Sequence, residues 1–333
     1  MSAEKILAIP TTEPERLFPN SLEEAAKEYR ALALKWHPDR SSDPSAAKVM
    51  AHISALYQTV LEKIKSGRWE AVGVRIFKAD RKTRKINYLT SRTFELGEML
   101  IGTNLVTFVI PTKYESYVLR GLRAAGSLHY PNKDWEKDLS GYFPKVEKYF
   151  EAEDSAVIML RKDPSSVLLS DLIRYCGGSL DPKHTAWIIS SLLNLCSFLE
   201  VSHTTHNALS PDTVFVSPKL HAAFLLGGWW YAAPTNKPLT AVPPYSHRLM
   251  TNLERERKTA AHRLDLQCIR EIGLELVGDA ITDLPKPYRE FLRLPAPASP
   301  IKDYEAWAKV LTDSYGARRF VKLDVTPSAV YGG

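Results

Sequence analysis

The chain has 333 residues, of which 44% are hydrophobic and 25% are charged, so it is long enough to form two domains with separate cores. Its formal net charge of +6 is modest. It contains three cysteines without a Cys-x-x-Cys pair, and no apolar stretch reaches membrane-spanning length, which argues against a disulfide scaffold, a zinc module and a membrane protein.

Cys176, Cys196 and Cys268 are isolated in apolar surroundings. We interpret them as reduced, buried thiols rather than as a disulfide or metal framework. The N-terminus lacks the basic and then apolar run of a signal peptide. We therefore expect a cytoplasmic protein without a membrane segment, metal or cofactor.

Residues 21–36 are predicted to form an amphipathic helix that begins with a capping box of Ser21 and Glu24. Apolar or small residues then recur at helical spacing: Leu22, Ala25, Ala26, Tyr29, Leu32, Ala33 and Trp36. The opposite face carries three basic residues and one apolar residue, namely Lys27, Arg30, Lys35 and Leu34. Pro38 ends the helix, because proline disfavours a helical conformation of the residue before it.

Asp43 and Pro44 predict the start of a second amphipathic helix, with Asp43 as N-cap and Pro44 in the first turn. Its apolar stripe consists of Ala46, Val49, Met50, Ile53, Leu56, Tyr57, Val60, Leu61 and Ile64. Two such helices joined by a short loop pack as an antiparallel hairpin. The loop then presents His37, Pro38, Asp39 and Arg40 at an exposed turn.

This pattern resembles the J domain of DnaJ-type co-chaperones over roughly the first 65 residues, including a short leading helix at residues 4–9. The resemblance implies that the loop and the basic helix bind an ATP-loaded DnaK-class chaperone and stimulate its ATP hydrolysis, which traps the bound client. By this resemblance, the triplet of His37, Pro38 and Asp39 is the trigger. Lys27, Arg30 and Lys35 attract the acidic chaperone surface, and Leu34 adds an apolar contact.

Two features depart from the family pattern. Residues 10–20 form a longer connection between the first two helices than is usual, and no fourth helix with a basic and aromatic signature is evident after Ile64. The alternative interpretation is that the His-Pro-Asp triplet is an ordinary surface turn and that the basic residues form a solvated helix face.

Residues 74–77 and 86–89 are predicted strands, and residues 79–85 form the tip of a basic hairpin between them. The basic residues of this region are Arg75, Lys78, Arg81, Lys82, Arg84, Lys85 and Arg92. Nucleic acid is an alternative partner for this surface. We favour a solvated hairpin, because no aromatic residues are interleaved in the tip for base stacking.

The chain after Trp69 is rich in strands first and in helices later. Further strands are predicted at residues 94–96, 99–101, 105–110, 156–160, 213–216 and 222–226. Buried helices are predicted at residues 182–199 and 265–277, and residues 232–245 form a proline-containing irregular loop. We expect the aromatic run at residues 229–231 to pack under a loop rather than to form a peptide-binding shelf.

This order of a strand-rich and a helical lobe resembles the protein-kinase fold over residues 72–320. The segment from His206 to Thr213 is similar to the kinase catalytic loop, His-Arg-Asp-Leu-x-Pro-x-Asn. Leu226 and Gly228 stand where the Asp and Gly of Asp-Phe-Gly would be. By the same resemblance, Asp265 has a structural role, because the leading Asp of the long helix in the helical lobe braces the catalytic loop.

The residues that carry phosphoryl transfer are missing from this frame. Ala208, Ser210, Thr213 and Leu226 stand at the positions of the base, the neighbouring lysine, the second metal ligand and the first metal carboxylate. The strand at residues 105–110 has no lysine, and the Gly-rich loop is reduced to Gly97 and Gly102. We interpret the domain as a pseudokinase that is not an enzyme.

The predicted fold is therefore multidomain. An all-α J-domain helical hairpin (1–68) precedes an α+β two-lobed kinase-like domain, with a strand-rich lobe (69–170), a helical lobe (171–320) and a tail (321–333). The predicted function is that of a co-chaperone for a DnaK-class chaperone, with the kinase-like domain recognising a protein client. Three alternatives stay open: an atypical active kinase or nucleotide-binding enzyme that uses Asp212 and Asp265, a nucleic-acid-binding adaptor, and an unrelated α+β fold.

Overall fold

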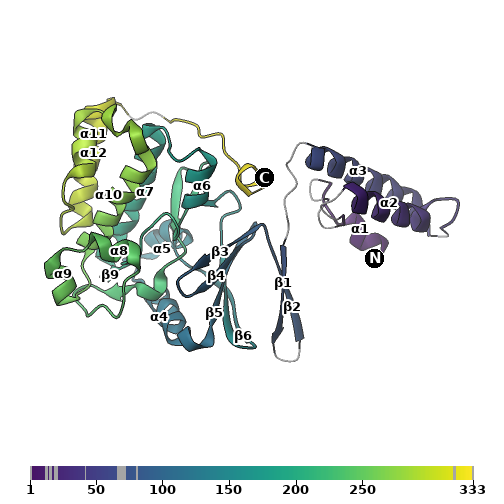
Figure 1. The fold of residues 1–333 in the computed structure, drawn as a ribbon, viewed down its shortest axis with the longest axis horizontal. Coiled ribbons are helices and arrows are strands. Elements are labelled where there is room, and N and C mark those ends of the chain that lie inside the picture. The colour runs from purple at the N-terminus through teal and green to yellow at the C-terminus, as the bar shows by residue number, and fades with distance from the viewer. Residues whose placement is uncertain are drawn as a thin grey trace. The chain divides into compact units, whose positions relative to one another are not determined.

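The computed structural model describes residues 2–11, 14, 17–18, 22–41, 43–65, 73–79, 82–317 and 320–331. The chain forms two compact units, both visible in Figure 1. Unit 1 contains residues 1–75, 85–90 and 327–333, and unit 2 contains residues 76–84 and 91–326. Helices and β-sheets are both present, so the protein is a multidomain α+β protein. Within the described part of the chain, each helix is too short or too polar to cross a lipid bilayer.

The two units differ from the predicted division of the chain. The boundary expected between residues 68 and 69 lies outside the described residues. The two lobes expected at residues 69–170 and 171–320 fall for the most part within the single unit 2. The expected tail ends in a short helix, α13 (Pro327–Tyr331), whose residues belong to unit 1.

Unit 1 is built on the helices α1 (Ala3–Leu7), α2 (Leu22–Trp36) and α3 (Ala46–Lys65), and α2 packs against α3 as a hairpin. The core consists of Ile6, Ile9, Phe18, Ala25, Leu32, Trp36, Val49, Ile53, Leu56 and Val60. At its edge, the rings of Tyr29 and Tyr57 stack with their centroids 4.3 Å apart. His52 Nε2 donates a hydrogen bond to the carbonyl of Ile9 at 2.8 Å, which ties the segment after α1 to α3.

The helix ends depart from the sequence predictions in detail. Ser21, the expected N-cap of α2, lies outside the described residues. Leu22, expected in the apolar stripe, is exposed, because the buried positions of α2 begin one turn later at Ala25. Helix α3 begins at Ala46 rather than at Pro44. The Asp43 carboxylate accepts hydrogen bonds from the hydroxyl and the N–H of Ser45, which lower the pKa of Asp43 and stabilise the turn that leads into α3.

Unit 2 contains a five-stranded antiparallel sheet with the strand order β3-β4-β5-β7-β6. Its strands are β3 (Thr90–Phe94), β4 (Gly97–Ile101), β5 (Leu105–Pro111), β6 (Val146–Ala152) and β7 (Ser155–Arg161). β5 and β7, both predicted, pair from Leu105 opposite Arg161 to Pro111 opposite Ser155. The strand expected at residues 94–96 is wrong in position, because β3 ends at Phe94 and a turn follows.

A hairpin and two helices lie next to these strands in the sequence. The strands β1 (Gly73–Ala79) and β2 (Lys82–Tyr88) form a separate two-stranded sheet, in agreement with the predicted hairpin. Two residues of its tip, 80 and 81, lie outside the described residues. Helices α4 (Glu115–Gly126) and α5 (Lys133–Leu139) lie between β5 and β6, and neither was predicted.

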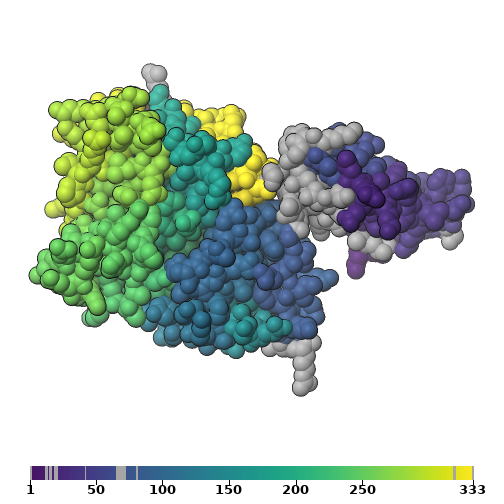
Figure 2. All heavy atoms as spheres, in the orientation of Figure 1, coloured from purple at the N-terminus to yellow at the C-terminus, as the bar shows by residue number. Residues whose placement is uncertain are grey.

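The rest of unit 2 is mainly helical (Figure 1). Its helices are α6 (Leu169–Tyr175), α7 (Pro182–Val201), α8 (Pro244–Leu249), α9 (Asn252–Arg257), α10 (His262–Val277), α11 (Lys286–Arg293) and α12 (Pro300–Tyr315). Short strands connect them: β8 (Val167–Leu168), β9 (Thr204–Thr205), β10 (Val214–Ser217), β11 (Ala222–Leu225) and β12 (Ala233–Pro234). α7 is buried between α10 and α12. In the space-filling view, the green atoms of the helical part of unit 2 are closely packed (Figure 2).

The cysteines and the aromatic run both lie mainly in the interior of unit 2. All three cysteines are free; Cys196 and Cys268 are buried, whereas Cys176 is only half-buried. Trp229, Trp230 and Tyr231 form the short 3-10 turn η4 and are buried, which confirms that the run packs rather than forming an exposed shelf.

The ring of Trp230 anchors η4 to the large sheet. It stacks on Phe94 and meets Phe108 edge-on, with centroid separations of 5.1 Å in both cases. The indole N–H of Trp229 donates to the carbonyl of Leu225 at 2.7 Å. The turn after β11 is therefore fixed by both packing and hydrogen bonding.

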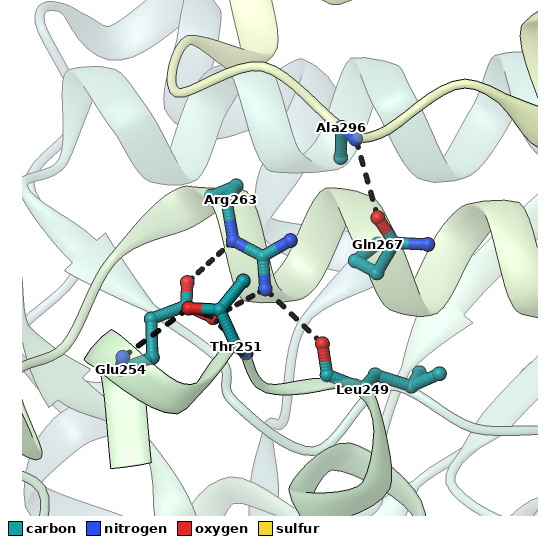
Figure 3. Close-up of polar contacts among 6 residues, drawn as sticks. All are labelled: Leu249, Thr251, Glu254, Arg263, Gln267 and Ala296. Carbon is teal, nitrogen blue, oxygen red and sulfur yellow. Dashed lines mark hydrogen bonds and ion pairs between the residues drawn. The ribbon is translucent and has the colours of Figure 1, made fainter. Parts of the chain in front are cut away.

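Helix α10 holds two neighbouring segments through its polar side chains (Figure 3). Arg263 forms an ion pair with Glu254 of α9 and donates to the carbonyl of Leu249 at 3.2 Å. The side-chain oxygen of Gln267 accepts a hydrogen bond from the N–H of Ala296, in the segment before α12. α10 is thus attached to the helices α8 and α9 on one side and to irregular backbone before α12 on the other.

A buried ion pair joins α10 to α12. The guanidinium of Arg270 donates to both carboxylate oxygens of Asp303 at 2.7 Å, and both side chains are 3% exposed. The same guanidinium lies over the Phe291 ring, and its Nε donates to the carbonyl of Leu294. Removal of either charge leaves the other buried without a partner.

We predict that Arg270→Ala lowers the free energy of unfolding of unit 2 by about 3–5 kcal/mol. Urea unfolding followed by tryptophan fluorescence measures this loss. Arg248→Ala is the matched control, because Arg248 pairs with Glu271 and Glu275 at a half-exposed position, and its loss should cost about 1 kcal/mol or less. Equal losses in the two variants would contradict the conclusion that the buried ion pair of Arg270 stabilises unit 2 more than the exposed ion pairs of Arg248.

Candidate functional site

The His-Pro-Asp triplet lies on the exposed turn between α2 and α3. α2 ends at Trp36, whose side chain is buried, and the three residues after it are exposed. The N–H groups of Arg40 and Ser41 both donate to the carbonyl of His37 at 2.9 Å. The turn therefore has a fixed backbone conformation while its side chains face solvent.

His37 and Asp39 also interact with each other. The N–H of Asp39 donates to His37 Nδ1 at 3.2 Å, and this nitrogen lies 3.6 Å from a carboxylate oxygen of Asp39. The side chains of His37 and Asp39 are 50% and 86% exposed, so the pair is open to a partner protein. In this arrangement Nδ1 accepts a hydrogen bond, and a neutral His37 therefore carries its proton on Nε2.

The predicted contact residues of α2 lie on its solvent-facing side. Lys27, Arg30 and Leu34 are exposed, and their spacing of three and four residues places them in one stripe. Leu34 is 61% exposed, so its side chain is accessible to a partner. Lys35 belongs to a neighbouring stripe, and its Nζ lies 5.8 Å from the ring centroid of Trp36.

The charge of α2 is unevenly distributed along its length. Lys27, Arg30 and Lys35 are balanced in number by Glu23, Glu24 and Glu28, so the helix has no net formal charge. Glu23 and Glu24 lie in the first turn, where negative charge complements the helix dipole. Arg30 and Lys35 lie in the half that leads to the His37 turn, so positive charge is concentrated there.

In unit 2, the segment from His206 to Thr213 is attached to α10 by a buried carboxylate. Asp265 is fully buried, and its two oxygens accept hydrogen bonds from the N–H groups of His206 and Asn207 at 2.8 and 2.6 Å. Burial raises the pKa of Asp265 to about 7. The hydrogen bonds from the two N–H groups favour the charged form and lower the pKa, but their effect is smaller. The structure thus brings His206 and Asp265 together.

His206 and Asn207 connect this segment to the turn after β11. His206 Nε2 donates to the carbonyl of Gly227 at 3.0 Å, and burial lowers the pKa of His206 to about 4, so the ring is neutral at pH 7. Asn207 has a φ of +62° and donates to the carbonyl of Tyr231 at 3.0 Å. Gly228 has a φ of +76°, and a Cβ there would lie 2.9 Å from Cβ of Ala208.

The positions compared with phosphoryl-transfer residues are uncharged and mostly buried. Ala208, Ser210 and Leu226 are buried, and Thr213 is half-buried. The hydroxyl of Thr213 donates to the carbonyl of Ala208 at 2.7 Å and closes the turn. Asp212, considered for an atypical enzyme, is exposed and is not among the residues that contact Asp265. Among the described residues, no group of three or more His, Cys, Asp or Glu side chains could hold a metal ion.

Two of the described basic residues around the β1–β2 hairpin contact other side chains. Arg92 lies on β3 and donates to Asp171 of α6 at 2.9 and 2.7 Å, so its charge is paired. The guanidinium of Arg84 lies over the ring of Phe150. Arg81 lies outside the described residues. Lys78 and Lys82 of the hairpin itself are exposed.

A cavity that the sequence did not indicate lies beside α4. It has a volume of about 360 Å³ and includes Arg120 and Arg123 among its lining residues. The lining also includes Ala124 and Ser127 on the same side, and residues of separate segments at Thr204 and at residues 231–241. The feature of the sequence that could have indicated this cavity is the pair of arginines three residues apart, Arg120 and Arg123.

No protein-family model matches the chain, and no curated protein matches its sequence. Functional inference for this protein therefore depends on the chemistry and geometry of its own residues.

We predict that Asp265→Asn lowers the free energy of unfolding of unit 2 by about 1–3 kcal/mol, because the amide NH₂ cannot accept one of the two backbone hydrogen bonds. Urea unfolding at pH 8, where the Asp265 carboxyl is ionised, measures the loss. Asp212→Asn is the matched control on the same segment, and at this exposed position a change of about 0.5 kcal/mol or less is expected. An equal effect of both substitutions would contradict the bracing role.

Proposed function

We propose that the protein is a J-domain co-chaperone, in which unit 1 stimulates ATP hydrolysis by a DnaK-class chaperone. The observation that carries the proposal is the exposed turn of His37, Pro38 and Asp39, held in a fixed conformation at the end of α2. The same triplet between two packed helices is the pattern on which the family resemblance rests.

The surface of α2 supports a docking role beside this turn. Arg30, Lys35 and the exposed Leu34 lie in the half of α2 that leads to His37. Exposed positive charge speeds encounter with an acidic surface, whereas an apolar side chain adds affinity when it is desolvated. We propose that Lys27, Arg30 and Lys35 attract the chaperone and that Leu34 contacts it directly.

The proposal is tested by single-turnover ATP hydrolysis of a purified DnaK-class chaperone in the presence of the intact protein. We expect stimulation that is lost in His37→Gln and in Asp39→Asn, because each substitution changes a side chain of the exposed turn. Lys35→Gln should reduce stimulation partially, and more strongly at low salt, because screening weakens the attraction of exposed charges.

His129→Gln and Asp138→Asn are matched controls, since both residues are exposed and lie in unit 2. They should stimulate as the unmodified protein does. Circular dichroism of all variants checks that the helices of unit 1 stay folded. Stimulation that persists in both His37→Gln and Asp39→Asn would contradict the proposed role of the turn, and so would the absence of stimulation by the intact protein.

We further propose that unit 2 is a kinase-like domain that has lost phosphoryl transfer and recognises a protein client. A sheet followed by helices, and a buried aspartate that accepts two backbone N–H groups from the segment at His206, support the kinase-like interpretation. Ala208 and Leu226 provide neither a base nor a metal ligand at the positions where the resemblance requires them.

We predict that ATP with Mg²⁺ or Mn²⁺ does not raise the melting temperature of the protein, because no charged side chain stands at these positions. Differential scanning fluorimetry with and without nucleotide measures the shift. A clear rise that Asp212→Ala abolishes would instead support an atypical nucleotide-binding enzyme. Asp138→Ala serves as the matched control for that substitution, since Asp138 is also exposed.

A further inference from the structure

The cavity beside α4 has one helical and one irregular wall. The helical wall is formed by Arg120, Arg123 and Ala124, whose spacing of three and four residues defines one stripe of α4, and by Ser127, which directly follows the helix. The irregular wall is formed by residues 231–234 and by Pro238, Thr240 and Ala241.

The helical wall is held firmly against the rest of unit 2. α4 packs on η4 through Gly121, where a Cβ would lie 2.8 Å from the backbone nitrogen of Trp230. Val118 is buried on the same side of the helix. This close approach fixes the rotation of α4, and the stripe of Arg120, Arg123 and Ala124 then faces the cavity.

The irregular wall is fixed by backbone hydrogen bonds, although it contains little regular structure. The N–H of Thr235 donates to the carbonyl of His203 at 2.9 Å, and the N–H of Leu239 donates to the carbonyl of Lys258 at 2.7 Å. Asn236 and Lys237 exchange hydrogen bonds with Ala260. A cavity between two such walls is pre-formed, which lowers the cost of ligand binding.

The charge of the cavity is positive. Its lining contains two guanidinium groups and no carboxylate. Arg120 is half-buried, and its guanidinium lies 5.2 Å from the ring centroid of Tyr117, which restricts its orientation. Glu95, which is not part of the lining, interacts with the hydroxyl of Tyr231; burial and then Glu95 raise the pKa of that hydroxyl.

The rest of the lining is mainly apolar with a few hydroxyl groups. The lining includes four alanines and two prolines, namely Ala124, Ala232, Ala233, Ala241, Pro234 and Pro238. Its hydroxyl-bearing residues are Ser127, Thr204, Thr240 and Tyr231. The volume of about 360 Å³ suits a small ligand or one side chain of a larger one.

We propose that this cavity binds an anionic group, a phosphate monoester or a carboxylate, that is attached to a small apolar body. Arg120 and Arg123 bind the anion, because a guanidinium donates two parallel hydrogen bonds to either oxyanion. The alanines and prolines receive the apolar body. This site lies in unit 2 and does not depend on the proposed co-chaperone activity of unit 1.

The test is a titration of the full-length protein with three probes, followed by amide chemical shifts in NMR spectra. The probes are phenyl phosphate, benzoate and the uncharged benzyl alcohol. We expect at least one anion to shift the amides of Ala232, Thr240 and Ala241 in a saturable way, with benzyl alcohol at least about tenfold weaker. Saturable binding of phenyl phosphate alone identifies a phosphate site, and binding of benzoate alone identifies a carboxylate site. Binding of both anions identifies a general anion site.

Arg120→Gln and Arg123→Gln should each weaken binding of the active anion by about tenfold or more. Arg257→Gln is the matched control, because Arg257 is exposed on α9 and is not part of the cavity lining. Arg123 is exposed, so its variant tests the site even where Arg120→Gln perturbs folding. Absence of saturable shifts for both anions, equal binding of benzyl alcohol, or unchanged binding in Arg123→Gln would overturn the proposal.

Discussion

The buried carboxylate of Asp265 is the constraint on which the interior of unit 2 depends. The segment at His206 and Asn207 runs through the core, where unpaired N–H groups are costly. Asn207 adopts a positive φ, and two successive N–H groups then reach the same carboxylate. α10 supplies that carboxylate from its first turn, so a regular helix and an irregular segment hold each other in place.

This attachment extends through hydrogen bonds and rings to both walls of the α4 cavity. Asn207 donates to the carbonyl of Tyr231, the last residue of η4, and Trp230 of the same turn packs on the sheet. α4 is packed on η4 in turn. Because these contacts are buried, a substitution of Asp265 is expected to change the conformation of the cavity lining, which includes Tyr231.

The sequence predicted the elements that carry either a clear apolar stripe or a continuous apolar run. α2 and α3 have one apolar stripe, whereas α7 and β5 are apolar on nearly all sides, and each element lies close to its expected position. α5 was missed because most of its seven residues are polar and none is buried. β6 was missed because burial is confined to Phe150 and Ala152 near its end, so its alternation is too short to recognise.

The candidate sites differ in how far sequence could reveal them. The turn at His37 is local, since its residues are adjacent and its helices flank it directly. The α4 cavity combines Arg120 with Thr204 and Thr240, which meet only through tertiary packing. The hydrophobic pattern of a single segment does not predict contacts between distant segments. A cavity between such segments is therefore found only once the fold is known.

The segment at His206 is held in place by hydrogen bonds within the protein itself. The residues that hold the segment, Asn207 and Asp265, are different from those at the positions of transfer chemistry. Ala208 and Leu226 are buried and apolar, so they leave no unpaired charge in the interior. A carboxylate introduced at the buried position of Leu226 would carry the free-energy cost of burying a charge without a partner.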